Sequence, residues 1–399
     1  MQASGWPAWD SGGCAGVGIA DRRMCFAVET RRLQRMEGAR DVPSGRPGAS
    51  LIKAAQWLFV AIAAIAAGGC SGTRPELPAD VSVAPLDQEA ATDEGTLVDA
   101  VDASTAAMSL TVVTFNTGSA GGGDPDTGFG SVQEQINQEL YGSGLAWVPY
   151  VSAVESFMAE LDPDIVAFQE IFAPIECAEI PAEAHAGFVC ETWKPGDPSV
   201  AESVLGPDFE VACHPDKPDK CVGLHRRVGT WRGPLFGTPV ADCGSGARVA
   251  RGVIDRIDGS VLTIVSVHGT SGLSDEESDC RVKQVEQVFV DVGDGAPGAN
   301  GAVNVVLGDL NTDPGRFAPG EASAERWNDF VGPGLPFGYL TEVGLDARPG
   351  YGGVFNIDHV ISDGLVGDCW IAGVSPGRPR VATQAFFDHR PVVCLVTPP

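Results

Sequence analysis

Residues 303–311, VNVVLGDLN, form an apolar run that ends in a carboxylate and an amide. Runs rich in Val and bounded by Gly and Asp are typical of β-strands, and a nearly continuous apolar run is covered on both faces. Side chains two residues apart on an extended chain share a face, so Asp309 and Asn311 project into the same space. The segment therefore predicts a buried strand that ends at a polar site.

Six other segments share this strand-like pattern: LTVVTFNT (110–117), DIVAFQE (164–170), ARGVIDRI (250–257), VLTIVSVHG (261–269), FNIDHVIS (355–362) and PVVCLV (391–396). Two segments have helical periodicity instead. Residues 148–161 place apolar side chains on one stripe, and residues 274–290 begin with Ser274 and Glu277 in the spacing of a capping box. Strands outnumber helices, so we expect a two-sheet core with the helices outside it, in one domain over residues 109–399.

Nearly every predicted strand ends in a residue with a reactive or metal-binding side chain. These residues are Asn116, Glu170, His268, Asp309, Asn311, Asp358 and the pair Asp388 and His389 before the last strand. Burying one polar group without a partner costs about 1–3 kcal/mol. Because six strand ends would each carry this cost, we expect them to converge on one site where the groups satisfy one another and a ligand.

In their order along the chain, the motifs TFN, QE, H, GDLN, IDHV and DHRPV resemble those of the endonuclease/exonuclease/phosphatase superfamily. That superfamily includes DNase I-like nucleases, sphingomyelinases and inositol-phosphate phosphatases. The resemblance covers the chain from Leu110 to its C-terminus. It implies an α/β (α+β) fold that is a four-layered αββα sandwich, in which two mixed sheets lie face to face with helices outside.

The resemblance also implies a divalent cation, most simply Mg²⁺, with Mn²⁺ or Ca²⁺ as alternatives. Glu170 would bind the cation, with Asn116 and Asp388 beside it; Mg²⁺ takes hard oxygen ligands and keeps several waters. Asn116 and Asn311 would contact phosphate oxygens. Asp309 would orient or deprotonate the attacking water.

The same resemblance assigns catalytic roles to two histidines. His389 would protonate or stabilise the phosphorane while Asp358 accepts its other N–H. His268 would be a second phosphate-binding or acid histidine, although a lone histidine at a strand end is more often structural. One departure is Phe387, because the family usually has Ser or Thr before the final Asp-His; this loss of a hydroxyl is expected to affect substrate choice.

Other polar residues receive weaker interpretations. His359 would face away from Asp358 on a strand and is expected to pack in the core. The pair Arg226-Arg227 is either solvated or a phosphate contact, and Arg251 is a weak candidate for a phosphate contact. Asp313 is expected to be a turn residue.

Eight cysteines follow residue 100, an even number that predicts disulfides in an exported chain: Cys177, Cys190, Cys213, Cys221, Cys243, Cys280, Cys369 and Cys394. The nearest neighbours, Cys213 and Cys221, are the simplest pair, and the segment between them is expected to be a surface loop. The spacing of Cys and His does not favour a structural zinc site.

The N-terminal region indicates export. The apolar run 54–67 is too short to span a bilayer and fits a signal peptide, and the small residues before Cys70 resemble a bacterial lipobox. We therefore expect a non-native or disordered extension over residues 1–50, a lipoprotein signal over 51–70 with lipidation at Cys70, and an acidic disordered tether over 71–108. The chain would be anchored at the periplasmic face or the cell surface.

The net charge of -27 disfavours tight, non-specific binding to nucleic acid. The sequence predicts an exported phosphoesterase, either sphingomyelinase-like or DNase I-like, that acts on a phospholipid head group, a nucleic acid or a small phosphoester. It would be a monomer that meets the membrane through its lipid anchor only. The alternative is a catalytically silent surface lipoprotein that uses the fold to bind a partner.

Overall fold

The computed structural model describes residues 109–119, 132–238, 243, 248–292, 296–382 and 387–399. The predicted extension, signal peptide, lipidation site and tether lie outside the described residues. Within the described part of the chain, no helix has the length and apolar character that crossing a bilayer requires.

Six of the described strands form the first sheet, in the order β12-β13-β1-β2-β4-β3. β1 and β2 are parallel, and the other neighbours are antiparallel, so the sheet is mixed. The strands are β1 Leu110–Asn116, β2 Ile165–Gln169, β3 Phe209–His214, β4 Lys217–His225, β12 Val366–Ile371 and β13 Val392–Thr397.

The second sheet runs in the order β10-β11-β9-β8-β7-β5, and β6 also pairs with β7. It is mixed as well, because β8 and β9 are parallel. Its described strands are β5 Gly229–Trp231, β6 Phe236–Thr238, β7 Val249–Arg256, β8 Val261–His268, β9 Asn304–Asp309, β10 Gly338–Tyr339 and β11 Asp358–Ser362.

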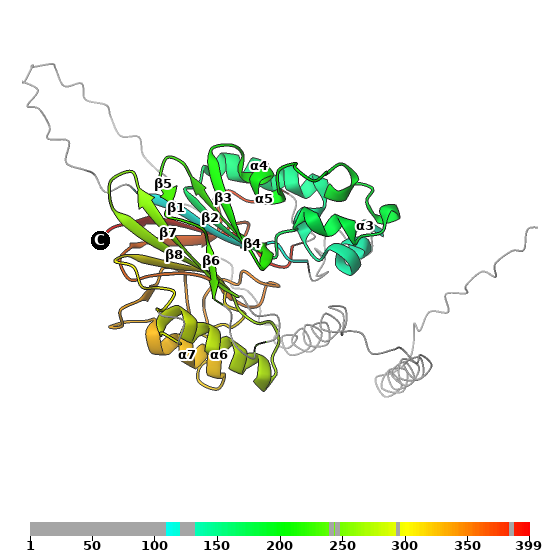
Figure 1. Ribbon diagram of the computed structural model, residues 1–399. Coiled ribbons are helices and arrows are strands. Elements are labelled where there is room, and N and C mark those ends of the chain that lie inside the picture. Colours follow the sequence, from blue (N-terminus) through cyan, green and yellow to red (C-terminus); the bar gives the residue numbers. More distant parts are fainter. Residues whose placement is uncertain (1–108, 120–131, 239–242, 244–247, 293–295, 383–386) are drawn as a thin grey trace, which may run out of the picture. The chain divides into compact units, whose positions relative to one another are not determined.

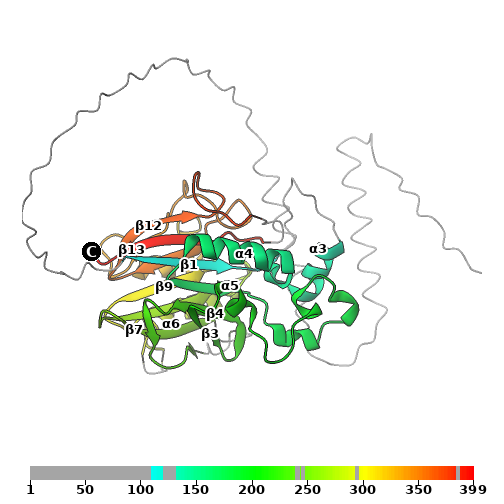
Figure 2. The same cartoon turned by 90° about the horizontal axis from the view of Figure 1, so that it is seen from above.

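The two sheets pack face to face, and helices cover both outer faces (Figures 1 and 2). Val112 of β1, Ile264 of β8 and Leu307 of β9 belong to the core between the sheets. On the outside of the first sheet, α4 Val148–Leu161 and α5 Val200–Leu205 pack against β1 and β2. On the outside of the second sheet, α6 Asp275–Phe289 and α7 Ala322–Phe330 pack against β8 and β9. The predicted four-layered αββα sandwich is confirmed.

Both predicted helices are present. α4 spans residues 148–161 with a proline in its first turn, and α6 begins after Ser274, whose side chain and that of Glu277 form the expected capping box. The remaining short helices lie mostly in the connections around β1 and β2: α3 Val132–Ile136, η1 Asn137–Tyr141, η2 Gly144–Ala146, η3 Pro174–Ala178, η4 Ala182–Ala184 and η5 Val189–Glu191.

One predicted loop is wrong. Residues 213–221 are not a surface loop but part of the hairpin of β3 and β4, which adds two strands to the first sheet beside β2. The polar residues of this segment concealed the alternation of β4, in which Val222 and Leu224 point between the sheets. The disulfide predicted within it is present, because Cys213 and Cys221 are bonded cross-strand neighbours.

All eight cysteines predicted to pair do so. The other bonds are Cys177–Cys190, Cys243–Cys280 and Cys369–Cys394. The last of these joins residues directly opposite each other on β12 and β13, so it fixes the strand that follows the Asp388-His389 loop.

Candidate active site

The polar strand ends meet at one edge of the space between the sheets. Asp309 at the end of β9 is paired in register with Asp358 on β11 and with His268 on β8. Asn116 at the end of β1, in the opposite sheet, donates from Nδ2 to Asp309 Oδ2 at 2.9 Å. This bond joins the two sheets at the predicted site.

Strand alternation explains why these side chains point inward. Asn116 shares its face of β1 with Val112, which lies in the core between the sheets. By the same count, His268 follows Ile264, Asp309 follows Leu307, and Asp358 precedes Val360 on their inward faces. The apolar core between the sheets therefore ends in a layer of polar side chains.

Asp309 is almost fully buried and is held by three donors. Its Oδ2 accepts from Nδ2 of Asn116 and Nδ2 of Asn311, both at 2.9 Å, and its Oδ1 accepts from the Asn311 backbone N–H at 2.7 Å. Burial raises the pKa of Asp309 to about 7, against the opposing effect of nearby His389. Asp309 is thus a rigidly oriented carboxyl whose pKa suits a base near neutral pH.

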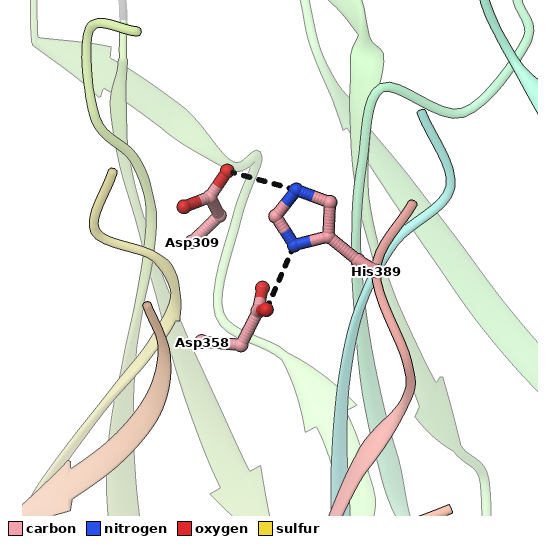
Figure 3. Close-up of side chains that lie close together, drawn as sticks. All are labelled: Asp309, Asp358 and His389. Atoms are coloured by element: carbon pink, nitrogen blue, oxygen red, sulfur yellow. Dashed lines mark hydrogen bonds and ion pairs between the residues drawn. The ribbon is translucent and has the colours of Figure 1, made fainter. Parts of the chain in front are cut away.

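His389 lies between two aspartates (Figure 3). Its Nδ1 is 2.7 Å from Asp358 Oδ2 and its Nε2 is 3.7 Å from Asp309 Oδ2. Burial alone would lower the pKa of this imidazole, but the carboxylates of Asp358 and Asp309 outweigh it and raise the pKa to about 10. At neutral pH His389 is therefore an imidazolium that donates its Nδ1–H to Asp358 and carries a second N–H on Nε2.

His268 differs from His389 in charge. Its Nε2 is 3.3 Å from Glu170 Oε1 and 3.8 Å from Asp309 Oδ2. Burial lowers the pKa of His268 to about 4, so the ring is neutral near pH 7. Its Nδ1 is buried without a hydrogen-bond partner in the described residues. Near pH 7 His268 is therefore neutral, whereas His389 is positively charged.

Glu170 reaches the site through an unusual backbone conformation. Residues 165 and 167 of β2 face inward, so strict alternation would turn residue 170 outward. Glu170 instead adopts a left-handed conformation with φ of 54°, and Asn311 does so with φ of 51°. Such conformations are costly for residues other than Gly and cluster at functional sites.

The oxygen atoms around Gly118 fit a hard divalent cation. A Cβ on Gly118 would lie 2.5 Å from Glu170 Oε2 and 3.0 Å from Asn116 Oδ1, so both oxygens face the same small space. Asp388 donates its backbone N–H to Gly118 O at 3.4 Å, and its Oδ1 is buried without a hydrogen-bond partner among the described residues. Burial raises the pKa of Asp388 to about 6, and the carboxylate of Glu170 adds to the rise. Crowded carboxylates of this kind are stabilised by a cation with oxygen ligands.

A second group of atoms is close enough to hold an ion. One ligand atom each of Asp309, Asp358 and His389 lies within 4.8 Å of the others. The imidazole, however, is protonated near pH 7 and bonded through Nδ1 to Asp358, and metals bind neutral imidazole. The chemistry therefore favours the oxygens around Gly118 as the cation site.

Two basic side chains and one tyrosine near the site were not predicted from the sequence. Arg248, just before β7, donates to Gly269 O at 3.2 Å and is attracted by Glu170 and Asp309. Lys220 faces inward on β4, nearly fully buried, with its Nζ 3.0 Å from Asp219. Tyr351 packs against the His389 ring, with centroids 4.5 Å apart.

Arg251, the weak candidate, is not part of this group. It shares its face of β7 with Val249, which packs in the outer core against α6 and α7. Arg248 lies on the opposite face, the one that Ala250 and Ile254 direct between the sheets. A count of alternation from Ile254 back to residue 248 would have selected Arg248.

The expectations for His359 and Asp313 are confirmed, and the one for Arg227 is not. His359 is buried outside the site, with its ring nitrogens 2.7 Å from Thr341 Oγ1 and 2.9 Å from Asn356 O. Arg227 binds Asp162 and Asp164 and is therefore neither simply solvated nor a phosphate contact. Asp313 caps a turn by accepting from the backbone N–H groups of Gly315 and Arg316.

Phe387 does not take the place of a site hydroxyl. Its ring packs in the outer core of the first sheet, with ring centroids 5.1 Å from Phe115 and 5.5 Å from Tyr150. The expected effect of the missing hydroxyl on substrate choice stays a prediction. Asp388 and His389, which follow it, turn back toward the site.

No family model matches the chain, and no curated protein matches it. Solved structures similar to it include humanized D. rerio TDP2 (13% identity, TM-score 0.43, covering 72% of this chain and 99% of that one). An endonuclease/exonuclease/phosphatase from Beutenbergia cavernae DSM 12333 has 15% identity and a TM-score of 0.42, covering 73% and 72%. The human Nocturnin catalytic domain with bound sulfate has 12% identity and a TM-score of 0.43, covering 73% and 94%. At these values the similarity carries no argument about activity.

Proposed function

We propose that this chain is a divalent-cation-dependent phosphoesterase that hydrolyses a phosphodiester or phosphomonoester by attack of water. The observation that carries the proposal is the arrangement of Asp309 and His389. A carboxyl with a pKa near 7 lies beside an imidazolium held by Asp358, so one site contains both a proton acceptor and a cationic donor.

In the proposed reaction Asp309 accepts a proton from water as the water oxygen bonds to phosphorus. The bond from phosphorus to the leaving oxygen breaks, and the Nε2–H of His389 donates to a phosphate oxygen as negative charge grows there. A cation bound by Glu170, Asn116 and Asp388 would add charge stabilisation. Asn311, already fixed against Asp309, would help to orient the phosphate.

Of the two roles implied for His268, phosphate binding and acid catalysis, we assign it phosphate binding. A neutral imidazole is a poor acid at pH 7, whereas its single N–H can donate to a phosphate oxygen. Deep burial supports this role, since it lowers the pKa of His268 and keeps the ring uncharged despite the nearby carboxylate of Glu170.

The substrate is a phosphoester of either the sphingomyelinase or the DNase I kind, and a parallel assay separates the two. Purified protein with Mg²⁺, Mn²⁺ or Ca²⁺ would be tested on plasmid DNA, sphingomyelin and inositol phosphates. We expect turnover of at least one substrate, abolished by EDTA. The absence of turnover with every metal would favour the alternative of a catalytically silent binding module.

We also propose that the chain is exported and lipid-anchored as a monomer. Four disulfides support an oxidising compartment, because such bonds persist outside the cytosol. The test is labelling with palmitate: the wild-type chain should take up the label, a Cys70→Ser variant should not, and globomycin should block processing. Equal labelling of the two proteins would contradict an anchor at Cys70.

A further inference from the structure

Tyr351 is tied to the loop that carries the catalytic histidine. It lies between β10 and β11 and forms an isolated β-bridge with His389. On one side, the Gly352 N–H donates to Asp388 O at 3.0 Å, and on the other, the Arg390 N–H donates to Gly350 O at 3.0 Å. These backbone hydrogen bonds therefore fix the position of Tyr351 relative to His389.

The phenol ring of Tyr351 packs against the imidazolium of His389. Their centroids are 4.5 Å apart and the rings are inclined by 45°. A cation within about 6 Å of an aromatic ring is attracted to it. The ring therefore lies close enough to stabilise the charged form of His389.

The hydroxyl of Tyr351 is available to a ligand. Tyr351 is half-buried, and its hydroxyl has no hydrogen-bond partner among the described residues. This hydroxyl is not enclosed, whereas that of Tyr339 is buried without a partner. Burial raises the pKa of the Tyr351 phenol, and so do the carboxylates of the site, Asp388 foremost. The group therefore stays protonated and lies near the residues proposed for catalysis.

We propose that Tyr351 is a further catalytic residue whose hydroxyl donates a hydrogen bond to a non-bridging oxygen of the substrate phosphate. This inference rests on the proposed phosphoesterase function. Removing the hydroxyl should then lower the rate without disturbing His389.

The test compares Tyr351→Phe, Tyr351→Ala and Tyr339→Phe in the full-length protein. The substrate is thymidine 5′-(p-nitrophenyl phosphate) with Mg²⁺, and each variant is first checked by thermal melting. Tyr351→Phe should lower both kcat and kcat/KM at least tenfold, about 1.4 kcal/mol. Tyr339→Phe makes the same chemical change outside the site and should stay within twofold of wild type.

The phenylalanine variant keeps the ring, so it separates donation from packing. If Tyr351→Phe matches wild type while Tyr351→Ala is slow, the residue only positions His389 and the proposed donation is refuted. A second arm uses the Rp and Sp phosphorothioate forms of the substrate. Because sulfur accepts hydrogen bonds weakly, the effect of Tyr351→Phe should shrink at least threefold on one isomer; equal effects on both isomers and on the oxygen substrate would also overturn the proposal.

Failure of the underlying function is recognised separately, because wild-type protein would then hydrolyse neither substrate. In that case binding of thymidine 5′-monophosphate, measured by calorimetry with Mg²⁺, tests the inference. Tyr351→Phe should weaken the affinity at least fivefold, and equal affinities would refute a contact between this hydroxyl and phosphate.

Discussion

Replacing Asp358 by Asn tests the origin of the charge on His389. The two side chains are buried and joined by a 2.7 Å contact between Asp358 Oδ2 and His389 Nδ1. The pKa of His389, about 10, lies above its ordinary 6.5, a preference for the imidazolium of roughly 5 kcal/mol. Burial lowers the pKa of His389, and Asp358 makes the largest contribution that raises it. Asp358→Asn keeps the shape of the side chain but removes its charge, so His389 should become neutral near pH 7.

The same pair has a signature in stability. Because the folded pKa of His389 is raised above its unfolded value, the stabilisation is complete below about pH 6.5 and is lost as pH rises through about 10. Asp358→Asn should therefore destabilise the fold most at neutral and mildly acidic pH. The exposed Asp346→Asn, which makes the same chemical change elsewhere, should not.

Two readouts measure the outcome. Nitrogen NMR of protein labelled in its six histidines, with His389→Gln for assignment, should show a charged His389 at pH 8 in wild type and a neutral one in Asp358→Asn. The rate on bis(p-nitrophenyl) phosphate should fall at least about a hundredfold, as loss of a positioned acid or base commonly causes. An Asp358→Asn protein with a charged His389 at pH 8, or with a rate within threefold of wild type, would refute the reasoning.

Three further changes probe other parts of the site and fold. Gly118→Ala places a Cβ 2.5 Å from Glu170 Oε2 and should raise the Mg²⁺ concentration for half-maximal rate at least tenfold. Gly338→Ala, which has open space around the added Cβ, should leave that concentration unchanged. Superimposable Mg²⁺ titrations of the two variants would count against the cation site. Asp309→Asn should lower the rate at least about a hundredfold yet leave the melting temperature at pH 8 equal or higher. Burial raises the pKa of this carboxyl to about 7, so the fold loses stability as pH rises from about 4 to 7, and the neutral amide removes that loss. A clearly lower melting temperature would show that the hydrogen bonds of Asp309 outweigh the effect of burial. Replacing Cys369 and Cys394 together by Ser should cost about 2–4 kcal/mol in urea unfolding, and an unchanged midpoint would show that the bond between β12 and β13 is dispensable.

Alternation along strands made much of the fold and site predictable. The apolar runs that contain Asn116, His268, Asp309 and Asp358 are regular, so their inward faces follow from a period of two. The motif order then indicated that these ends belong together. The bond between Asn116 and Asp309 across the two sheets agrees with that inference.

The parts that alternation alone does not reveal depend on irregular backbone or distant contacts. Glu170 faces the site only because of its left-handed conformation, which alternation cannot reveal. Tyr351 lies on a loop, and its bridge to His389 joins segments 38 positions apart by number. Lys220 sits in a hairpin whose polar residues resemble a loop, although the strand next to it in the sheet is the buried β2.

The most direct test of the account is the hydrolysis of bis(p-nitrophenyl) phosphate by wild-type, His389→Ala and Asp309→Asn proteins with Mg²⁺ and with EDTA. We expect steady release of p-nitrophenol by wild-type protein with Mg²⁺, none above background with EDTA, and at least about a hundredfold slower release by each variant. Release that persists in both variants, or that is indifferent to EDTA, would contradict the roles given to Asp309, His389 and the cation.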